Sequence, residues 1–183
     1  PPASGKEFAE QLEAKMDEIG VGKIASVAGR YYAMDRDNNY DRVQLAYNAM
    51  TKGEGETAAS GPAAIQQSYD NDKTDEFVMP TVVTENGQAI ATIKDDDSVI
   101  FFNFRPDRAR EITRAFCDND SEFQGFDRKR PEIKFVCFSE YDPTIPNKSV
   151  AFHKIAVTNT FGEWLAANNM TQARIAETEK YAH

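Results

Sequence analysis

Three arginines crowd around a single proline in the stretch VIFFNFRPDRAR, residues 99–110. A guanidinium group presents its donors in a fixed fork that matches the oxygens of carboxylate and phosphate. Arg105 precedes Pro106, and a residue before proline is biased toward extended geometry, whereas proline suits the first position of a helix. We therefore expect Arg105 and Arg108 to flank a helix N-terminus, where free backbone N–H groups and the helix dipole also favour an anion.

Further cations follow two other predicted strands. Arg30 and Arg36 come after the apolar stretch KIASVAG, and Lys180 comes after QARIAET. If the strands run parallel, these three side chains and the arginine pair described above converge on one edge of a sheet, where α/β folds bind ligands. Because the whole chain is acidic, such a local concentration of cations predicts a pocket for a small, doubly anionic metabolite.

Other chemistry is less well supported by the residue pattern. The alternative interpretation of the arginines is a set of surface side chains paired with acids such as Asp107 and Glu111. Asp35 and Asp37 lack the spacing of a calcium-binding loop, so a solvated surface is favoured over a metal site there. The serines lack the G-x-S-x-G pattern of a nucleophile elbow. No complete catalytic constellation is visible in the sequence.

The composition limits the partners. The chain has 183 residues, 40% of them hydrophobic, which is enough for one domain with a packed core. Its net charge of −9 argues against nucleic acid, which needs a basic face, and the apolar runs are too short to cross a membrane. Cys117 and Cys137 fall in a predicted helix and a predicted strand without ligand spacing, which indicates reduced core thiols in a cytoplasmic protein.

The elements that must position the arginines alternate along the chain. Ser4 with Glu7 forms a capping-box pattern that predicts a helix over residues 5–19. Further helices are expected to end at Gly53, to begin after Ser60, to span PDRAREITRAFC and to follow Thr160, with KGEGETAASG as a loop. Strands are expected in the following stretches, the third of which contains a turn at Asn-Gly: KIASVAG, SVIFFNF, EFVMPTVVTENGQAIATI, IKFVCFS, SVAFH and QARIAET.

This alternation predicts an α/β layered fold with one mixed, largely parallel sheet flanked by helices. The chain also begins on two prolines without an initiator methionine. That start is typical of a domain cut from a longer chain.

Three ordered stretches carry a family resemblance: GRYYAMDRD at 29–37, FFNFRPDRAR at 101–110 and RIAETEKYAH at 174–183. They resemble the signature stretches of cofactor-independent phosphoglycerate mutase. The resemblance implies an isomerase of glycolysis and gluconeogenesis that interconverts 3-phosphoglycerate and 2-phosphoglycerate. It also implies that residues 1–183 are the inserted phosphotransferase (substrate-binding) domain, with the metal-bearing, phosphatase-like domain absent.

The resemblance also assigns roles to individual residues. Arg30 and Arg36 are similar to the arginines that hold the glycerate, and Arg105 and Arg108 are similar to those that clamp its carboxylate or phosphate. Lys180 matches a lysine that neutralises the transferred phosphoryl group and is the one residue with a catalytic role. No metal ligand is expected in this chain, and the two Mn²⁺ ions of the family belong to the missing domain.

The departures from the family define what the chain is expected to do. A DGRD stretch, the serine nucleophile and the Mn²⁺ ligands are missing from the sequence. We therefore expect the chain to bind phosphoglycerate without turnover, with the phosphatase-like domain as its partner and neither nucleic acid nor membrane. The alternative is a stand-alone, non-catalytic module that binds a phosphometabolite. If the domain is inserted in a host, Pro1 and His183 are expected to lie close together.

Overall fold

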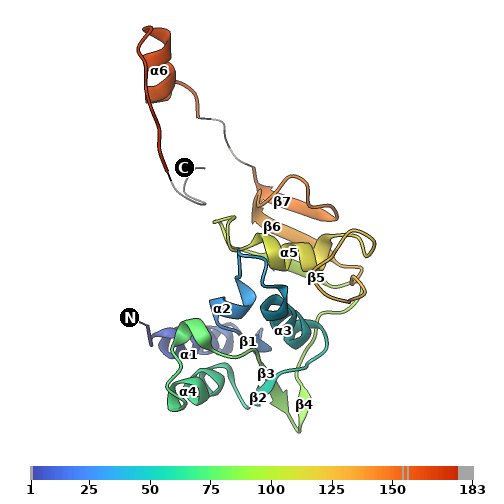
Figure 1. Ribbon diagram of the computed structural model, residues 1–183. Coiled ribbons are helices and arrows are strands. Elements are labelled where there is room, and N and C mark those ends of the chain that lie inside the picture. The colour runs from blue at the N-terminus through green and yellow to red at the C-terminus, as the bar shows by residue number, and fades with distance from the viewer. Residues whose placement is uncertain (1, 154, 156, 177–183) are drawn as a thin grey trace.

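The computed structural model describes residues 2–153, 155 and 157–176. Lys180, Pro1 and His183 lie outside the described residues, as does the expected closeness of the two termini. None of the described helices is long and apolar enough to cross a membrane. The elements, shown in Figure 1, follow in chain order: α1 (Gly5–Ile19), β1 (Ser26–Val27), α2 (Arg30–Ala33), α3 (Tyr40–Thr51), β2 (Glu56–Ala58), α4 (Gly61–Asp70), a 3-10 turn (Asp75–Phe77), β3 (Thr81–Glu85), β4 (Gln88–Ala89), β5 (Ser98–Phe101), α5 (Arg110–Cys117), β6 (Lys134–Ser139), β7 (Lys148–Phe152) and α6 (Phe161–Ala167).

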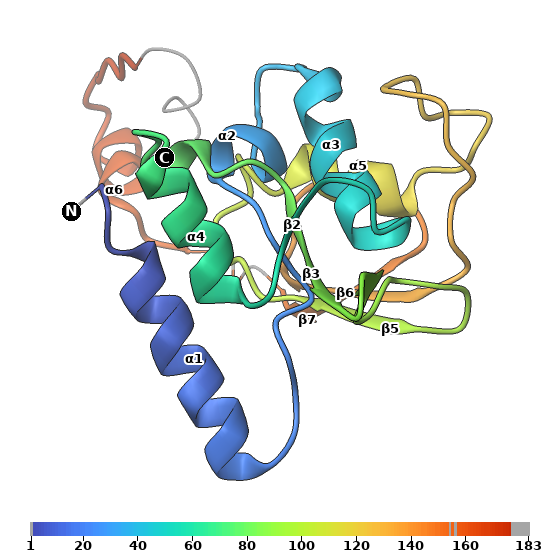
Figure 2. The same ribbon diagram turned by 90° about the horizontal axis from the view of Figure 1, so that it is seen from below.

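The first sheet is built around β3. β1 pairs with it antiparallel, β2 pairs with it parallel on the other side, and β4 folds back on it as a hairpin. The hairpin turns at Asn86 and Gly87, which have φ of 53° and 77°, as the Asn-Gly pair predicts for a two-residue turn. Helix α4 packs against this sheet and α1 lies beside α4 (Figure 2), where Ala9, Ile65 and Val78 form a small hydrophobic cluster.

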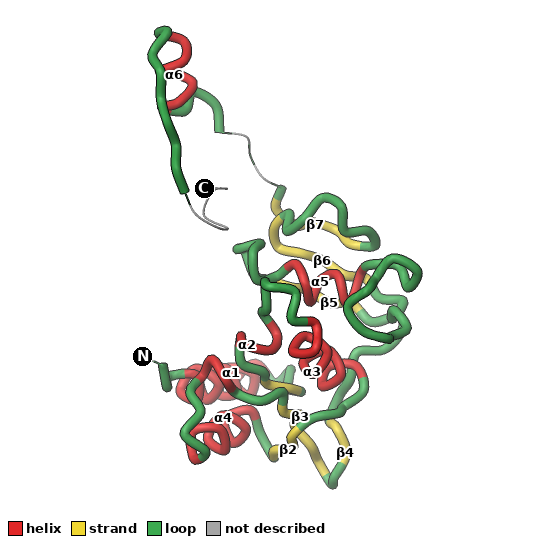
Figure 3. The backbone as a smooth tube through the Cα atoms, viewed as in Figure 1, coloured by secondary structure: helices red, strands yellow, loops and turns green. Residues whose placement is uncertain are grey.

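The second sheet contains β5, β6 and β7, all parallel, with β6 in the centre. Phe101, Cys137 and Val150 are aligned across it. In Figure 3 its strands form a group separate from those of the first sheet. Helix α6 stands apart from both groups (Figure 1).

One hydrophobic core joins the second sheet to a helix of the first part of the chain. Val43 and Tyr47 of α3 pack with Ile112 and Phe116 of α5, and Phe135 of β6 completes the contact. The Tyr47 and Phe116 rings are 4.9 Å apart between centroids. Burial of each such side chain is worth about 1.5–3 kcal/mol, so α3 and α5 hold the two parts together.

The expected α/β class with mixed strand directions is confirmed, but the described strands form two sheets and not one. The segment after the hairpin leaves the first sheet, because the N–H of Ile93 bonds to the carbonyl of Met50 on α3. The N–H of Asp96 then bonds to the carbonyl of Glu132, close to the start of β6. The chain therefore opens a new sheet at β5.

Four smaller expectations are also corrected. KGEGETAASG contains β2, because Glu56 joins the edge of β3, and the described part of QARIAET, residues 172–176, contains no strand. Helix α5 begins at Arg110 and not at Pro106. Ser4 makes no side-chain cap on α1. Helices α1, α3 and α4 and the capping box of α6 are confirmed.

Candidate anion-binding site

Two arginines from distant parts of the chain share one carboxylate. Arg105 donates from Nε and Nη2 to the two oxygens of Asp107, at 3.1 and 3.0 Å. Arg36 donates from Nη1 to Oδ2 of the same residue at 3.0 Å. Two guanidinium groups thus converge on a single carboxylate, and guanidinium donors of this kind match carboxylate and phosphate oxygens in general.

Arg108 joins this group through the backbone of the opposite segment. Its Nη1 donates to the carbonyl oxygen of Met34 at 2.9 Å. The N–H of Asn38 in turn donates to Oε1 of Glu111 at 2.9 Å. The loop 34–39 is therefore held against the segment 105–111 by contacts at both of its ends, and we call Arg36, Arg105 and Arg108 the arginine cluster.

Asp35 gives the loop 34–39 its shape. Its carboxylate is 4% exposed and accepts hydrogen bonds from the N–H groups of Asp37 and Asn39 at 2.9 and 2.8 Å, and from Nδ2 of Asn39. Asn38 between them has φ of 63°, a left-handed conformation that asparagine tolerates better than most residues. Arg42 contacts Asp35 at 3.4 Å. These bonds fix the direction in which Arg36 leaves the loop.

Asp107 is ionised within the cluster. Burial alone would raise the pKa of Asp107, but hydrogen bonds from Arg105 and Arg36 lower it, so its carboxyl stays ionised at neutral pH. Both arginines form ion pairs with this carboxylate, each at 3.0 Å. The Arg105 side chain is 64% exposed and that of Arg36 27%, so both remain accessible to a ligand.

Arg30 is placed differently. It begins α2, one helical turn before Met34, and its Nη2 pairs with Glu76 at 3.0 Å. The backbone there is tight, because a Cβ on Gly29 would lie 2.3 Å from the carbonyl oxygen of Glu76. Arg30 borders a separate cavity of about 380 Å³ together with Asp75 and Glu76. The structure thus brings together the other three predicted arginines, while Arg30 points to Glu76.

The reason given from the sequence for this convergence was wrong. β1 and β5 belong to different sheets, so their ends do not define a common sheet edge. Pro106 does not start α5 either: residues 106–109 form a turn closed by the N–H of Ala109 and the carbonyl of Pro106. The side chains of Asp107 and Arg108 are engaged with Arg36 and Met34, and α5 begins only after these contacts. Tertiary contacts, and not a helix N-terminus, assemble the cluster.

Sequence reasoning noticed Asp107 and Glu111 only as surface partners for arginine. For Arg105 and Asp107 that pairing is present, but Arg36 joins it from a distant segment. Glu111 is 6% exposed and bonds to the loop backbone. Its place on the buried side of an amphipathic helix was the available signal, since a charged residue there needs a specific partner.

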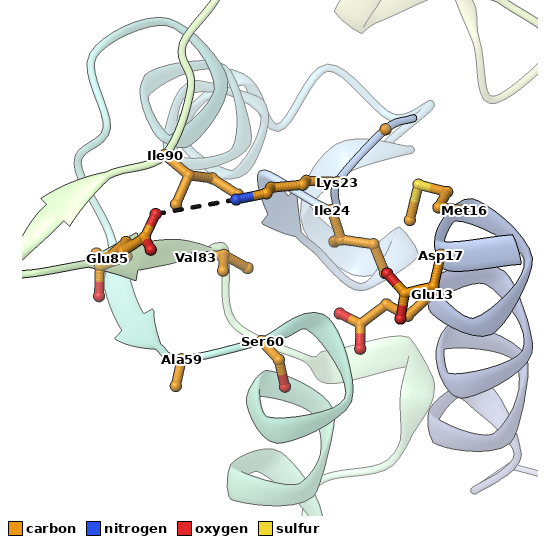
Figure 4. Close-up of a pocket in the computed structure, with 12 residues that line it drawn as sticks. Glu13, Met16, Asp17, Lys23, Ile24, Ala59, Ser60, Val83, Glu85 and Ile90 are labelled. Carbon is orange, nitrogen blue, oxygen red and sulfur yellow. Dashed lines mark ion pairs between the residues drawn. The ribbon is translucent and has the colours of Figure 1, made fainter. Parts of the chain in front are cut away.

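A second cavity, of about 290 Å³, lies between α1, the start of α4 and β3 (Figure 4). Glu13, Asp17 and Glu85 line it, and Lys23 pairs with Glu85 at 3.9 Å across it. The N–H of Gly61 at the start of α4 donates a hydrogen bond to Oε1 of Glu13. This acidic lining repels anions, so the cavity is not a competing site for phosphate or carboxylate.

Among the described residues, no three or more His, Cys, Asp or Glu side chains are grouped so that they could hold a metal ion. Two manganese ions therefore do not fit the described part of the chain. Cys117 and Cys137 are free and buried. Burial raises the pKa of Cys117 to about 12 and that of Cys137 to about 11, which keeps both thiols protonated and unreactive.

Comparison with known proteins defines the class of protein to which this fold and cluster belong. Residues 1–143 match the sequence model of a family described as "BPG-independent PGAM N-terminus". The chain therefore belongs to this family.

Matches to individual proteins are more specific than the match to the family model. The chain is 66% identical over 184 residues to the 2,3-bisphosphoglycerate-independent phosphoglycerate mutase of Lachnoclostridium phytofermentans, and 60% identical over 182 residues to that of Clostridium perfringens. Both matches cover 100% of this chain and 35% of the relative. A crystal structure of Leishmania mexicana phosphoglycerate mutase at low cobalt concentration matches with a TM-score of 0.76 and 31% identity, over 91% of this chain and 32% of that one. The chain thus spans about a third of the length of these proteins.

Proposed function

We propose that this chain is the substrate-binding, phosphotransferase part of a phosphoglycerate mutase that interconverts 3-phosphoglycerate and 2-phosphoglycerate. The observation that carries the proposal is the convergence of Arg36 and Arg105 on one carboxylate, with Arg108 bound to the same loop. The names of the relatives supply the substrate, and the cluster supplies the chemistry that would hold it.

Phosphoglycerate carries a carboxylate and a phosphate, and each matches the guanidinium fork. In this proposal one anionic group of the ligand takes the place of Asp107 on Arg36 and Arg105. Arg30 would reach the other end of the ligand after release from Glu76, which is an exposed pair of low cost to break. Arginines that hold both ends fix the orientation of the bound glycerate. Positioning and charge neutralisation are the main requirements of phosphoryl transfer.

The remaining machinery belongs to the proposal as well. Lys180 would neutralise the phosphoryl group during transfer. A nucleophile and two manganese ions would come from a phosphatase-like partner domain, where the metal would polarise the phosphoryl oxygens. The chain alone would then bind phosphoglycerate without converting it. The buried, protonated thiols support work in a reducing compartment such as the cytoplasm.

Calorimetric titration of the chain with 3-phosphoglycerate tests this proposal. We expect binding that weakens as salt rises, because partly exposed ion pairs are screened. Arg105→Ala and Arg36→Ala should each weaken binding by about tenfold or more, which corresponds to the loss of one charge-assisted contact.

The matched control is Arg114→Ala in the last turn of α5, the helix that follows the cluster, where the arginine is paired with Asp118 and Asp142. It should leave the affinity unchanged. Equal loss in Arg114→Ala and Arg105→Ala, or no loss in either, would contradict the proposal. Mutase activity of the chain with added Mn²⁺ would overturn the division of labour between the two domains.

A further inference from the structure

Glu111 is a buried carboxyl group that forms no ion pair with any residue that the structure describes. It lies on the first turn of α5 and is 6% exposed. Its Oε1 accepts the N–H of Asn38, whereas Oε2 is buried and has no hydrogen-bond donor among the described residues. A buried polar atom without a partner costs free energy, so an ionised Glu111 would be destabilised at Oε2.

No lysine or arginine among the described residues forms an ion pair with Glu111. The titratable groups that act on it are Asp35 and Asp37 of the loop 34–39 and Tyr40 of α3. The next charged groups are Arg42, which contacts Asp35, and Arg114 and Asp118, which act on Tyr40. Arg42 pairs with Asp35, and Arg114 pairs with Asp118 and Asp142. Within the part of the chain that the structure describes, neither arginine forms an ion pair with Glu111.

Protonation of Glu111 would remove its buried negative charge and turn one of its oxygens into a hydrogen-bond donor. Burial, followed by the negative charges of Asp35 and Asp37, raises the pKa of Glu111 to about 7, although the bond from Asn38 acts in the opposite direction. For Asp35, burial alone would raise the pKa, but bonds from Asn39, Asp37 and Glu111 lower it. The two carboxyls therefore differ in role: Asp35 is the acceptor, and Glu111 keeps the proton and donates.

We propose that Glu111 is a positioning residue for the arginine cluster: its protonated carboxyl binds both Asp35 and the backbone of Asn38, and so fixes the loop that carries Arg36 on the helix that follows Arg105 and Arg108. Ionisation of Glu111 places two buried carboxylates side by side and loosens this contact. The effect on the ligand rests on the proposed function, whereas the hydrogen bond to Asp35 does not.

The first experiment follows the proton without any ligand. The side-chain carboxyl carbon of Glu111 is titrated by NMR in the 183-residue chain, together with the hydrogen exchange of the Asn38 amide. We expect the Glu111 signal to titrate near pH 7 and the exchange of Asn38 to accelerate over the same range, beyond the intrinsic effect of pH. A Glu111 signal that titrates near its ordinary value of 4.5 overturns the proposal.

The second experiment compares the wild type with Glu111→Gln, which keeps an oxygen for Asn38 and a permanent N–H donor for Asp35. The phosphate of the ligand itself gains charge near pH 6, so the quantity to compare is the ratio of the two affinities for 3-phosphoglycerate. The ratio should be close to one at about pH 5.5 and should favour the variant by roughly three- to tenfold at about pH 8.5. Glu7→Gln, an exposed change on α1, is the control and should follow the wild type at both values.

The outcomes separate the two proposals. If the wild type binds no phosphoglycerate at any pH, the proposed function fails, while the titration and the exchange of Asn38 still decide the role of Glu111. If the ligand binds but the ratio for Glu111→Gln is constant with pH, the positioning role fails and the proposed function stands.

Discussion

The two ends of α5 use the same residue types to opposite effect. Before its N-terminus, Arg36 and Arg105 share the single carboxylate of Asp107. At its C-terminus, Arg114 contacts two carboxylates, Asp118 at 3.2 Å and Asp142 at 2.9 Å. Two arginines meet on one carboxylate before the helix, and one arginine meets two carboxylates at its end.

Burial separates the two ends as well. The side chain of Arg128, which packs at the C-terminal end, is 2% exposed and pairs with Asp120. It also donates to the carbonyl of Asp118 at 2.7 Å, and its guanidinium lies 4.4 Å from the Phe123 ring centroid. The side chain of Arg105 is 64% exposed. An enclosed arginine that bonds to the backbone supports the fold, whereas an arginine at an accessible surface can contact a ligand.

The largest effect should come from the most enclosed arginine. Arg128→Met should lower the free energy of unfolding by about 3 kcal/mol, because it removes an enclosed guanidinium that bonds to the carbonyl of Asp118 and pairs with Asp120. Urea denaturation measures this loss, and calorimetry should show phosphoglycerate affinity unchanged under conditions where the variant is folded. A loss below about 1 kcal/mol would mean that the C-terminal end of α5 is no more structural than the cluster.

Glu111 should produce a pH-dependent effect of intermediate size. The folded chain holds a proton on Glu111 up to about pH 7, whereas the unfolded chain releases it near 4.5. The stability from this group is therefore complete below about 4.5 and is lost as the pH rises to about 7. Relative to Glu111→Gln, the wild type should lose about 1–3 kcal/mol across that window. Urea midpoints at several pH values test this, and parallel curves for the two proteins would contradict it.

The smallest stability effects give the sharpest contrast between the two ends. Arg114→Ala should cost about 1–2 kcal/mol, because it leaves Asp118 and Asp142 without their cation. Arg105→Ala should change stability by no more than about 0.5 kcal/mol, since its pair with Asp107 is exposed on the arginine side. Thermal unfolding of both variants in one buffer provides the measurement. If Arg105→Ala were the more destabilising of the two, the cluster and not the C-terminal end of α5 would have the structural role.

Local signals in the sequence predicted local structure well. The apolar period and Gly20 define α1, Ser60 caps α4 through the N–H of Ala63, and Thr160 with Glu163 forms the capping box of α6. The arginines were identified by residue type. Of the four that the structure describes, Arg36 and Arg105 contact the same carboxylate, and Arg108 contacts the loop that carries Arg36. Such features depend on a few neighbouring residues, which is why they can be derived from the sequence.

Features that depend on distant contacts could not be derived. The start of α5 is set by side chains that reach Arg36 and Met34, more than 70 positions away. The division into two sheets depends on the path of the chain past α3 after β4. The raised pKa of Glu111 depends in part on the nearby charge of Asp35. In each case the deciding partner is remote in the sequence, and neither periodicity nor turn chemistry contains that information.

The start of α1 illustrates such a remote partner. The N–H groups of Ser4 and Gly5 both donate to Oδ2 of Asp75 at 3.0 Å, 71 and 70 positions further along the chain, and Tyr69 of α4 bonds to the other oxygen. The first helix therefore acquires its cap only when the 3-10 turn is in place. In terms of folding cooperativity, we expect α1, α4 and this turn to open and close together as one unit. Protection of the α1 amides from hydrogen exchange should thus depend on the carboxylate of Asp75, which the ribosome adds about 70 residues after the start of the helix.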